Sequence, residues 1–206
     1  MGKTGIRRAT LGRLPMYLQY ILENVDSPTI SASKIARDLG LGEVQVRKDL
    51  SMICDAGRPK VGYETEILRR CIESILGTHE LTPVVIIGAG RLGQALLGYN
   101  GFLEFGLKII AGFDNDPAKC GTEVFGKMIY PLSDFQEYCS ANNVSIAALT
   151  VPASEAQAVA EFAVENGITA IWNFAPYKIN VPESICVKQE NLALSLAYLN
   201  ISAKEQ

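Results

Sequence analysis

The feature that most constrains the fold is the apolar run Val84–Ile87, which ends in the glycine pattern Gly88-Ala-Gly-Arg-Leu-Gly93. A helical pattern follows directly. A strand, a G-x-G-x-x-G turn and a helix in this order are typical of a dinucleotide-binding unit. Gly88 permits the tight turn, Gly90 lets the backbone approach a pyrophosphate, and Gly93 allows close helix–strand packing. We expect the phosphates at the N-terminus of that helix, where unpaired N–H groups favour anions. The expected contacts include the whole turn: Gly88, Ala89, Gly90, Arg91, Leu92 and Gly93.

Strands and helices alternate after this motif. The apolar patterns predict strands at 84–87, 107–113, 145–151 and 168–174, and a helix at 155–166. This alternation predicts a parallel, doubly wound sheet of the Rossmann type. The segment Gly77–Pro83 is the expected hinge, which divides the 206 residues into domains 1–80 and 81–206.

An acidic residue stands where such a fold contacts ribose. Asp114 follows Gly93 by 21 residues and ends the second predicted strand, where a carboxylate can bind the ribose hydroxyls. Asp116 adds negative charge that would repel a 2′-phosphate, so the pair favours NAD(H) over NADP(H). Two alternatives stay open: a glycine turn that binds nothing, and a coenzyme A site on the same kind of sheet.

The first eighty residues show helical periodicity instead. Predicted helices cover 14–25, 33–39, 43–53 and 66–76, with Ser31 or Ser33 capping the second. The break at Gly40–Gly42 makes the middle pair a helix-turn-helix, whose second helix would enter the major groove. Gln45, Arg47 and Lys48 lie off its apolar face and are donors suited to bases and phosphates. A basic turn at Gly57–Tyr63, here called the wing, would complete a winged helix. A small helical bundle with solvated charges is the alternative.

Charge divides unevenly between the two halves. Residues 1–80 hold 12 Lys and Arg against 10 Asp and Glu, whereas residues 81–206 hold 7 against 12. A mildly basic front half suggests an acidic partner for that half. No apolar run approaches the roughly 20 residues of a membrane span, and no signal-peptide core is present at the start, so we expect a cytoplasmic protein.

The side chains needed for catalysis or metal binding are scarce. The five cysteines are scattered without a Cys-x-x-Cys pair, so we expect buried thiols rather than zinc ligands or disulfides. His79 is the only histidine, and it lies in the hinge. No Tyr-x-x-x-Lys pattern occurs, and about 120 residues after Pro83 leave no room for a separate substrate domain. We therefore predict that the chain is not an enzyme, with a small NAD-dependent oxidoreductase as the alternative.

Several stretches together resemble the Rex family of bacterial redox-sensing transcriptional repressors. They span both predicted domains in the family's order: Arg13–Ile21, Gln45–Ser51, Val61–Tyr63, Gly88–Leu96, Tyr99–Phe102, Phe113–Pro117, Ala148–Pro152 and Trp172–Pro176. The resemblance implies a homodimeric repressor that binds palindromic operator DNA when NADH is low and releases it when NADH binds. NADH and NAD⁺ are then effectors that compete for one pocket.

The same resemblance assigns roles to particular residues. Gln45, Arg47 and Lys48 would contact the groove, with Arg58 and Lys60 in the wing. The dinucleotide site would add to the glycine turn the residues Tyr99, at the nicotinamide end, and Asp114, Asn115, Thr150, Pro152, Asn173 and Pro176. The apolar segment 191–201 would form a helix that crosses onto the partner subunit. A helix packed on its own sheet is the alternative for that segment.

Two positions depart from the family pattern. The stretch Ile53–Lys60 differs from the usual wing, and Pro59 restricts its own backbone and that of its neighbour, so operator preference is expected to differ. Asn191 stands where many members carry an aspartate that takes part in a redox-dependent charged contact across the dimer. A neutral side chain there is expected to weaken, alter or abolish the NADH response, unless Glu190 substitutes for the aspartate.

Overall fold

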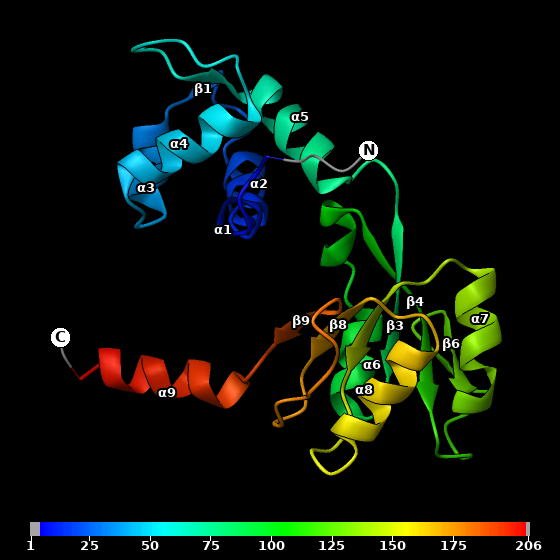
Figure 1. The fold of residues 1–206 in the computed structure, drawn as a ribbon. Coiled ribbons are helices and arrows are strands. Elements are labelled where there is room, and N and C mark those ends of the chain that lie inside the picture. The colour runs from blue at the N-terminus through cyan, green and yellow to red at the C-terminus, as the bar shows by residue number, and fades with distance from the viewer. Residues whose placement is uncertain (1–4, 205–206) are drawn as a thin grey trace. The chain divides into compact units, whose positions relative to one another are not determined.

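The computed structural model describes residues 5–204. Residues 1–4 and 205–206, the outer ends of the domains expected from the sequence, lie outside this range. The chain divides into two compact units (Figure 1). One contains the residues up to Glu80 together with Glu104–Gly106, and the other contains Leu81–Leu103 and the residues from Leu107 onward.

The N-terminal unit is a winged helix-turn-helix. Its helices are α1 (Arg8–Leu11), α2 (Leu14–Glu23), α3 (Ala32–Asp38), α4 (Glu43–Ile53) and α5 (Thr65–Leu76). Strands β1 (Thr29–Ile30) and β2 (Tyr63–Glu64) pair antiparallel at the base of the wing. Apolar side chains from α2 to α5 form a single core, in which Leu18, Ile35 and Leu50 are inaccessible to solvent. Ser31 is the cap of α3, since its hydroxyl accepts the Lys34 N–H at 3.1 Å.

The C-terminal unit is a seven-stranded sheet. Its strands are β3 (Thr82–Ile87), β4 (Leu107–Asp114), β5 (Glu123–Val124), β6 (Lys127–Pro131), β7 (Ile146–Leu149), β8 (Ala170–Asn173) and β9 (Cys186–Gln189). Their order is β5-β6-β4-β3-β7-β8-β9, and every pair is parallel except β5–β6. Apart from the added edge strand, this is the Rossmann order, whose ligand crevice lies where the strand order reverses, between β3 and β7.

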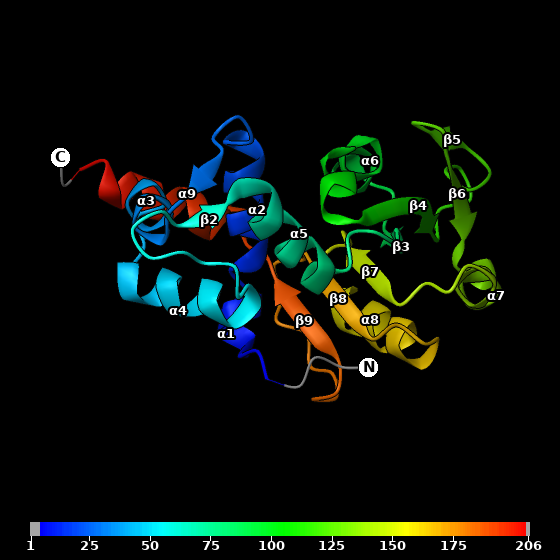
Figure 2. The same cartoon turned by 90° about the horizontal axis from the view of Figure 1, so that it is seen from above.

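Helices cover both faces of this sheet, as Figure 2 shows. The helices are α6 (Arg91–Gly98), α7 (Phe135–Ala141) and α8 (Ala156–Glu165). Alternate side chains of β3 point to opposite faces: Val84 and Ile86 share a core with Leu97 of α6, while Val85 and Ile87 pack with side chains of α7 and α8. The predicted doubly wound sheet and the winged helix-turn-helix are both confirmed.

Some elements escaped prediction. Strand β9 was missed because all four of its residues are exposed, so no apolar alternation marks it. β6 and α7 were missed as well; they follow the turn after β4 and are short. Two 3₁₀ helices, Gly101–Phe105 and Leu132–Asp134, are the remaining short elements.

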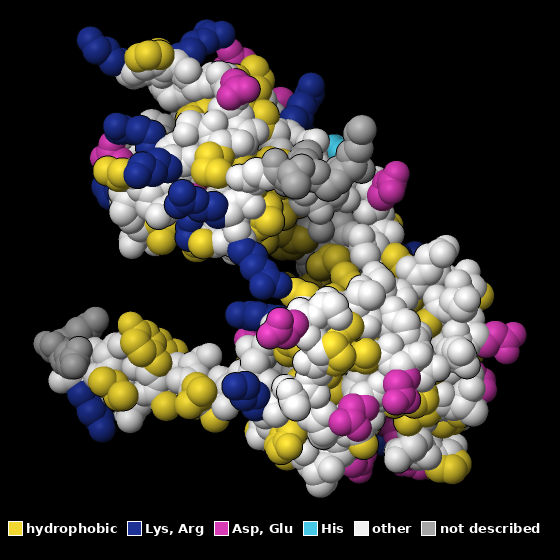
Figure 3. Space-filling model, in the orientation of Figure 1, with side chains coloured by type: hydrophobic (Ala, Val, Ile, Leu, Met, Phe, Trp, Pro, Cys, Tyr) yellow, Lys and Arg dark blue, Asp and Glu magenta, His cyan; other side chains and the backbone are white. Residues whose placement is uncertain are grey.

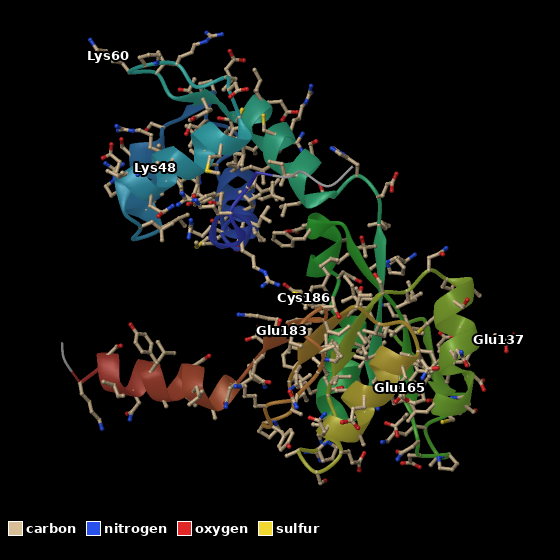
Figure 4. The ribbon with its side chains drawn as sticks, viewed as in Figure 1. Lys48, Lys60, Glu137, Glu165, Glu183 and Cys186 are labelled. Atoms are coloured by element: carbon tan, nitrogen blue, oxygen red, sulfur yellow. The ribbon has the colours of Figure 1, made fainter. Side chains whose placement is uncertain are left out.

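The cysteine expectation was only partly right. Cys54 and Cys139 are buried, but Cys71 and Cys120 are partly accessible and Cys186 on β9 is exposed (Figure 4). No three His, Cys, Asp or Glu side chains among residues 5–204 lie close enough to hold a metal ion. Within the same range, no helix combines the length and apolarity needed to cross a bilayer.

Candidate dinucleotide pocket and nucleic-acid interface

A pocket of about 410 Å³ opens at the point where the strand order reverses. Residues following three neighbouring strands line it: Gly88 and Gly90 after β3, Asp114, Asn115 and Lys119 after β4, and Thr150, Val151 and Pro152 after β7. The carboxyl ends of parallel strands meet at one edge of a sheet, which explains how segments 60 residues apart reach one hollow.

The three glycines of the turn have different surroundings. A Cβ on Gly93 would lie 2.0 Å from the Gly88 carbonyl oxygen, so only glycine lets α6 approach β3 this closely. Gly88 has φ +99° and backs onto Thr150, whose hydroxyl donates to the Gly88 carbonyl at 2.6 Å. A Cβ on Gly90 would meet nothing within 4 Å, and Gly90 is the uncapped N-terminus of α6. The space before that helix end is therefore open to a phosphate.

Asp114 is the buried, charged group of this pocket. Its Oδ2 accepts the Ala89 N–H at 2.7 Å and the Lys119 ammonium at 2.9 Å, and its Oδ1 accepts the Asp116 N–H at 2.9 Å. Burial would raise the pKa of Asp114, but these hydrogen bonds outweigh burial and hold the pKa below its ordinary value. The carboxylate is thus ionised and fixed at the edge of the pocket.

The other expected residues of this site divide into two groups. Asn115, Thr150 and Pro152 line the pocket with Asp114. Arg91 is exposed and Leu92 is 36% exposed, both in the first turn of α6. Asn173 lies outside the lining: it is the buried last residue of β8, and its amide N–H group donates to the Tyr177 carbonyl and to the Gln189 side-chain oxygen, each at 2.8 Å. It orders the loop that holds Pro176, which is exposed.

Tyr99 lies at a different place from the glycine turn. Its side chain is 59% exposed and begins a row of aromatic rings. Tyr99 meets Phe102 at 4.8 Å between ring centroids, Phe102 meets Trp172 at 5.6 Å, and Trp172 meets Phe174 at 4.4 Å. Tyr99 borders a separate hollow of about 70 Å³ with Phe102 and Lys127. The structure therefore does not bring Tyr99 into the pocket with Asp114.

The expected DNA-binding residues lie on α4 and the wing of the N-terminal unit. Figure 3 shows Lys and Arg side chains gathered on one face of this unit. Arg47 of α4 lines a hollow of about 600 Å³ together with Arg58 and Lys60 of the wing. Lys48 is exposed on α4, and Lys60 stands near the wing tip (Figure 4). The hollow thus joins the helix-turn-helix to the wing through cationic side chains.

The wing is a tight turn. The backbones of Arg58 and Gly62 form an antiparallel bridge with N–H···O distances of 2.8 and 2.9 Å. Between them Lys60 adopts φ +65°, a left-handed conformation uncommon for a residue with a side chain. The Arg58 guanidinium also pairs with Glu64 at 3.1 Å. The tight turn follows Pro59, in the stretch where a departure from the usual wing was expected.

A buried carboxylate, Asp49, was overlooked in the sequence. It accepts the Thr10 hydroxyl at 2.8 Å, the Tyr17 hydroxyl at 2.8 Å and the Arg13 Nε at 2.7 Å. The Gln45 side-chain amide donates to Asp49 at 2.9 Å. The side chain of this expected groove contact therefore lies along the surface of its own helix, α4. Burial would raise the pKa of Asp49, but its donors hold the pKa below its ordinary value. Asp49 therefore fixes α4 to α1, to α2 and to Arg13 between them.

Helix α9 (Leu192–Ser202) has no buried residue. Figure 3 shows hydrophobic side chains along the visible surface of this helix. Its large apolar side chains are 60–70% exposed: Leu192, Leu194, Leu196, Tyr198, Leu199 and Ile201. Asn191 caps the helix by accepting the Leu194 N–H at 3.1 Å. Glu190 accepts the Trp172 indole N–H at 3.2 Å, so this carboxylate already holds a donor. A helix that is apolar all round is typically covered by another surface.

Comparison with known proteins matches both units. A family profile described as "CoA binding domain" matches residues 79–177, and one described as "Putative DNA-binding protein N-terminus" matches residues 5–51. Curated relatives named redox-sensing transcriptional repressor Rex align along nearly the whole chain. The protein from Bacteroides thetaiotaomicron is 38% identical over 95% of this chain and 90% of its own. That from Pelotomaculum thermopropionicum is 38% identical over 97% and 96%.

Solved structures agree with these relatives. The complex of RSP, a Rex-family repressor, with β-NAD⁺ and operator DNA has a TM-score of 0.88 and 31% identity, covering 98% of this chain and 94% of that one. RSP with β-NADH has a TM-score of 0.86 and 30% identity, covering 98% and 96%. The relatives are named for repression and not for catalysis, in agreement with the prediction that the chain is not an enzyme. The chain belongs to the Rex family of redox-sensing transcriptional repressors.

Proposed function

We propose that this protein is a homodimeric transcriptional repressor that binds a palindromic operator when NADH is low and releases it when NADH binds. The observation that carries the proposal is the presence, in one chain, of a winged helix-turn-helix and a pocket lined by the glycine turn and Asp114 at the strand-order reversal. Family membership adds relatives named as redox-sensing repressors and a structural neighbour bound to β-NAD⁺ and operator DNA. Because the proposed operator is chromosomal DNA, the proposed location is the cytoplasm.

The dinucleotide is proposed to lie along the glycine turn, with its pyrophosphate before α6. Gly90 leaves space for the phosphate oxygens, and Asp114 accepts the ribose hydroxyls. Asn115, Thr150 and Pro152 border the rest of the ligand. The pocket around Gly90 and Asp114 does not include Tyr99, Asn173 or Pro176. We assign these three residues to the nicotinamide end of the ligand.

Operator DNA is proposed to contact α4 and the wing. Arg47, Lys48 and Gln45 would enter the major groove, and Arg58 and Lys60 would contact the flanking backbone. A symmetric dimer would place two copies of α4 about 34 Å apart or a multiple of that distance, to match a palindrome. The basic hollow between α4 and the wing supports this assignment because it groups cations on one face.

The dimer is proposed to form through α9. Six large apolar side chains on one short helix remain exposed in the isolated chain, and a second copy would cover them. NADH would favour a dimer geometry in which the two α4 helices no longer match the operator. A hundredfold loss of operator affinity needs a coupling free energy of roughly 2.7 kcal/mol, within the usual range for allostery.

The test is fluorescence anisotropy on a palindromic Rex-type operator at fixed salt, titrated with NADH and then NAD⁺. We expect NADH to release the DNA and NAD⁺ to leave it bound. Gly90→Ala should fold normally yet bind NADH at least tenfold more weakly, because the added methyl has room in the protein but occupies the phosphate space. Gly12→Ala, another glycine with room for a methyl, is the matched control.

Coenzyme A is the competing ligand, because residues 79–177 match a profile described as a CoA binding domain. Calorimetry with NADH and with coenzyme A, in the same buffer, separates the two. Heat from coenzyme A alone would overturn the assignment of the pocket and leave the DNA-binding half of the proposal standing. Operator binding that ignores NADH would overturn the sensing half.

A further inference from the structure

Two thiols lie in contact inside the DNA-binding unit. Cys54 directly follows the last residue of α4, and Cys71 lies in α5. Their Sγ atoms are 2.7 Å apart, which is too long for a disulfide bond and requires only a small approach to form one. Seventeen positions separate the two cysteines, and the wing lies between them in the chain. A bond between them would close a loop that contains the whole wing.

The two thiols differ in access. Cys54 is 4% exposed, whereas Cys71 is partly accessible and lines a hollow of about 900 Å³. Met52, Ile67 and Arg70 line the same hollow, and the Arg70 guanidinium pairs with Glu66 at 2.8 Å. Reactive cysteines are typically partly exposed and near a positive group. A small oxidant therefore reaches Cys71 first and finds Cys54 directly behind it.

Tyr63 connects this thiol pair to the wing. Tyr63 and Cys54 are buried in the same apolar cluster, and Cys71 packs against that cluster. The Tyr63 ring also packs so tightly on Gly57 that a Cβ there would lie 2.8 Å from the ring. Any shift of the Tyr63 ring must therefore move the start of the wing.

We propose that Cys54 and Cys71 form a reversible disulfide on exposure to a hydroperoxide, and that this bond lowers affinity for DNA by displacing the wing. The Cys71 thiolate attacks a peroxide oxygen; the O–O bond breaks, giving the Cys71 sulfenic acid and, from hydrogen peroxide, one water. The Cys54 sulfur then attacks the Cys71 sulfur and displaces hydroxide, which leaves as a second water with the Cys54 proton. Each peroxide is reduced by two electrons, and the two thiols are oxidised to one disulfide.

The other cysteines provide built-in controls. Cys139 is buried, and burial raises its pKa to about 11, so it carries little reactive thiolate. Cys120 donates its S–H to the Asp114 carbonyl at 3.3 Å. Cys186 is exposed, but among residues 5–204 only the Cys54 and Cys71 sulfurs lie within hydrogen-bonding distance of each other. We therefore expect oxidation to join only the first pair.

The experiment treats the full chain, without NADH, with a stoichiometric amount of hydrogen peroxide. Intact mass and non-reducing peptide mapping should show the loss of two hydrogen atoms and a Cys54–Cys71 linkage. Operator affinity, measured by anisotropy, should fall about tenfold and return after dithiothreitol. Cys54→Ser and Cys71→Ser should keep the affinity of the reduced protein and ignore peroxide, whereas Cys186→Ser should respond like the parent.

The two halves of the proposal fail separately. An unchanged mass, or a linkage between other cysteines, overturns the disulfide. A Cys54–Cys71 linkage with unchanged operator affinity overturns the effect on the wing. The affinity measurement rests on the proposed function: if the reduced chain binds no operator, that function fails, while the mass measurement still decides the disulfide. Peptide mapping on the parent protein keeps the test independent of how well the serine variants fold.

Discussion

Each unit of the molecule contains one buried, ionised aspartate, and the two are held differently. Asp49 in the N-terminal unit is bonded entirely by side chains, from Thr10, Arg13, Tyr17 and Gln45. Asp114 in the C-terminal unit is bonded by two backbone N–H groups and by Lys119, and it borders a pocket. Side-chain donors of the protein occupy the acceptor sites of the Asp49 carboxylate. The Asp114 carboxylate accepts fewer hydrogen bonds from the protein and borders a pocket. Burial and a lowered pKa therefore do not by themselves mark a ligand site.

The largest expected effect comes from removing the Asp49 carboxylate. Asp49→Ala leaves the buried Tyr17 hydroxyl and the Arg13 guanidinium without their acceptor, and should cost about 3 kcal/mol of the free energy of unfolding. Urea unfolding of the full chain, followed by circular dichroism, measures this loss. Asp38→Ala is the control, because its carboxylate accepts a tyrosine hydroxyl at the surface and should matter less. A loss no larger than that of the control would contradict the structural role.

Asp114→Asn tests the other member of the comparison. The variant should lose less of the free energy of unfolding than Asp49→Ala does, yet bind NADH about 10- to 100-fold more weakly, because a neutral amide is a poorer acceptor for the ribose hydroxyls than a carboxylate. Calorimetry with NADH measures the affinity. Asp116→Asn removes the same negative charge close by, but from an exposed side chain, and should have the smaller effect. Equal effects of the two variants would mean that charge alone, and not a directed hydrogen bond, holds the ribose.

The sequence predicts the Asp114 site but not the Asp49 site. Asp114 was predictable because its partner motif, the glycine turn, fixes both its spacing and its place at a strand end. Asp49 was not, because one aspartate on an amphipathic helix resembles a solvated charge. Its donors Thr10 and Tyr17 lie 39 and 32 positions away and approach only through tertiary packing.

Lys119 and the Cys54–Cys71 pair were missed for the same reason. Lys119 reaches Asp114 only because the loop after β4 turns back on itself, and that path leaves no periodic signal. Cys54 and Cys71 have no recognised spacing, and the sequence suggested buried thiols for both. The helices were predicted because their apolar residues recur with the helical period, and the central strands because they are continuous apolar runs, buried on both faces of the sheet. The exposed β9 has neither signal.

Acid should weaken both units. The pKa of each aspartate is lowered in the folded chain from its ordinary value of 3.8, so each stabilises the fold fully above about pH 4. This stabilisation is lost as the pH falls through the folded pKa, with a slope of at most about 1.4 kcal/mol per pH unit for each group. Urea unfolding between pH 5 and pH 2 measures the slope. Asp49→Asn should flatten it; an unchanged slope would assign acid sensitivity to other carboxylates.

Single cations of the DNA-binding face should matter less. Lys48→Ala and Arg58→Ala should each weaken operator binding up to about tenfold and, where the side chain contacts phosphate, lower the salt-dependence slope by about 1. Anisotropy at several salt concentrations measures both quantities. Lys108→Ala, an exposed cation on β4, should change neither. If both variants bind like the parent at every salt concentration, α4 and the wing do not form the interface.

The smallest expected effect concerns Lys119, which neutralises the Asp114 site. Its ammonium lies 2.9 Å from Asp114 and 3.7 Å from Asp116, and it is the only cation lining the pocket within residues 5–204. Lys119→Gln leaves two carboxylates unopposed where a 2′-phosphate would lie, so NADPH affinity should fall a few-fold further than NADH affinity. Competition of NADPH with NADH in calorimetry measures the ratio, with Lys188→Gln on β9 as the control. Equal losses for both dinucleotides would mean that Asp114 sets the selectivity through its hydrogen bonds. Asp114 would then differ from Asp49 only in its access to a pocket.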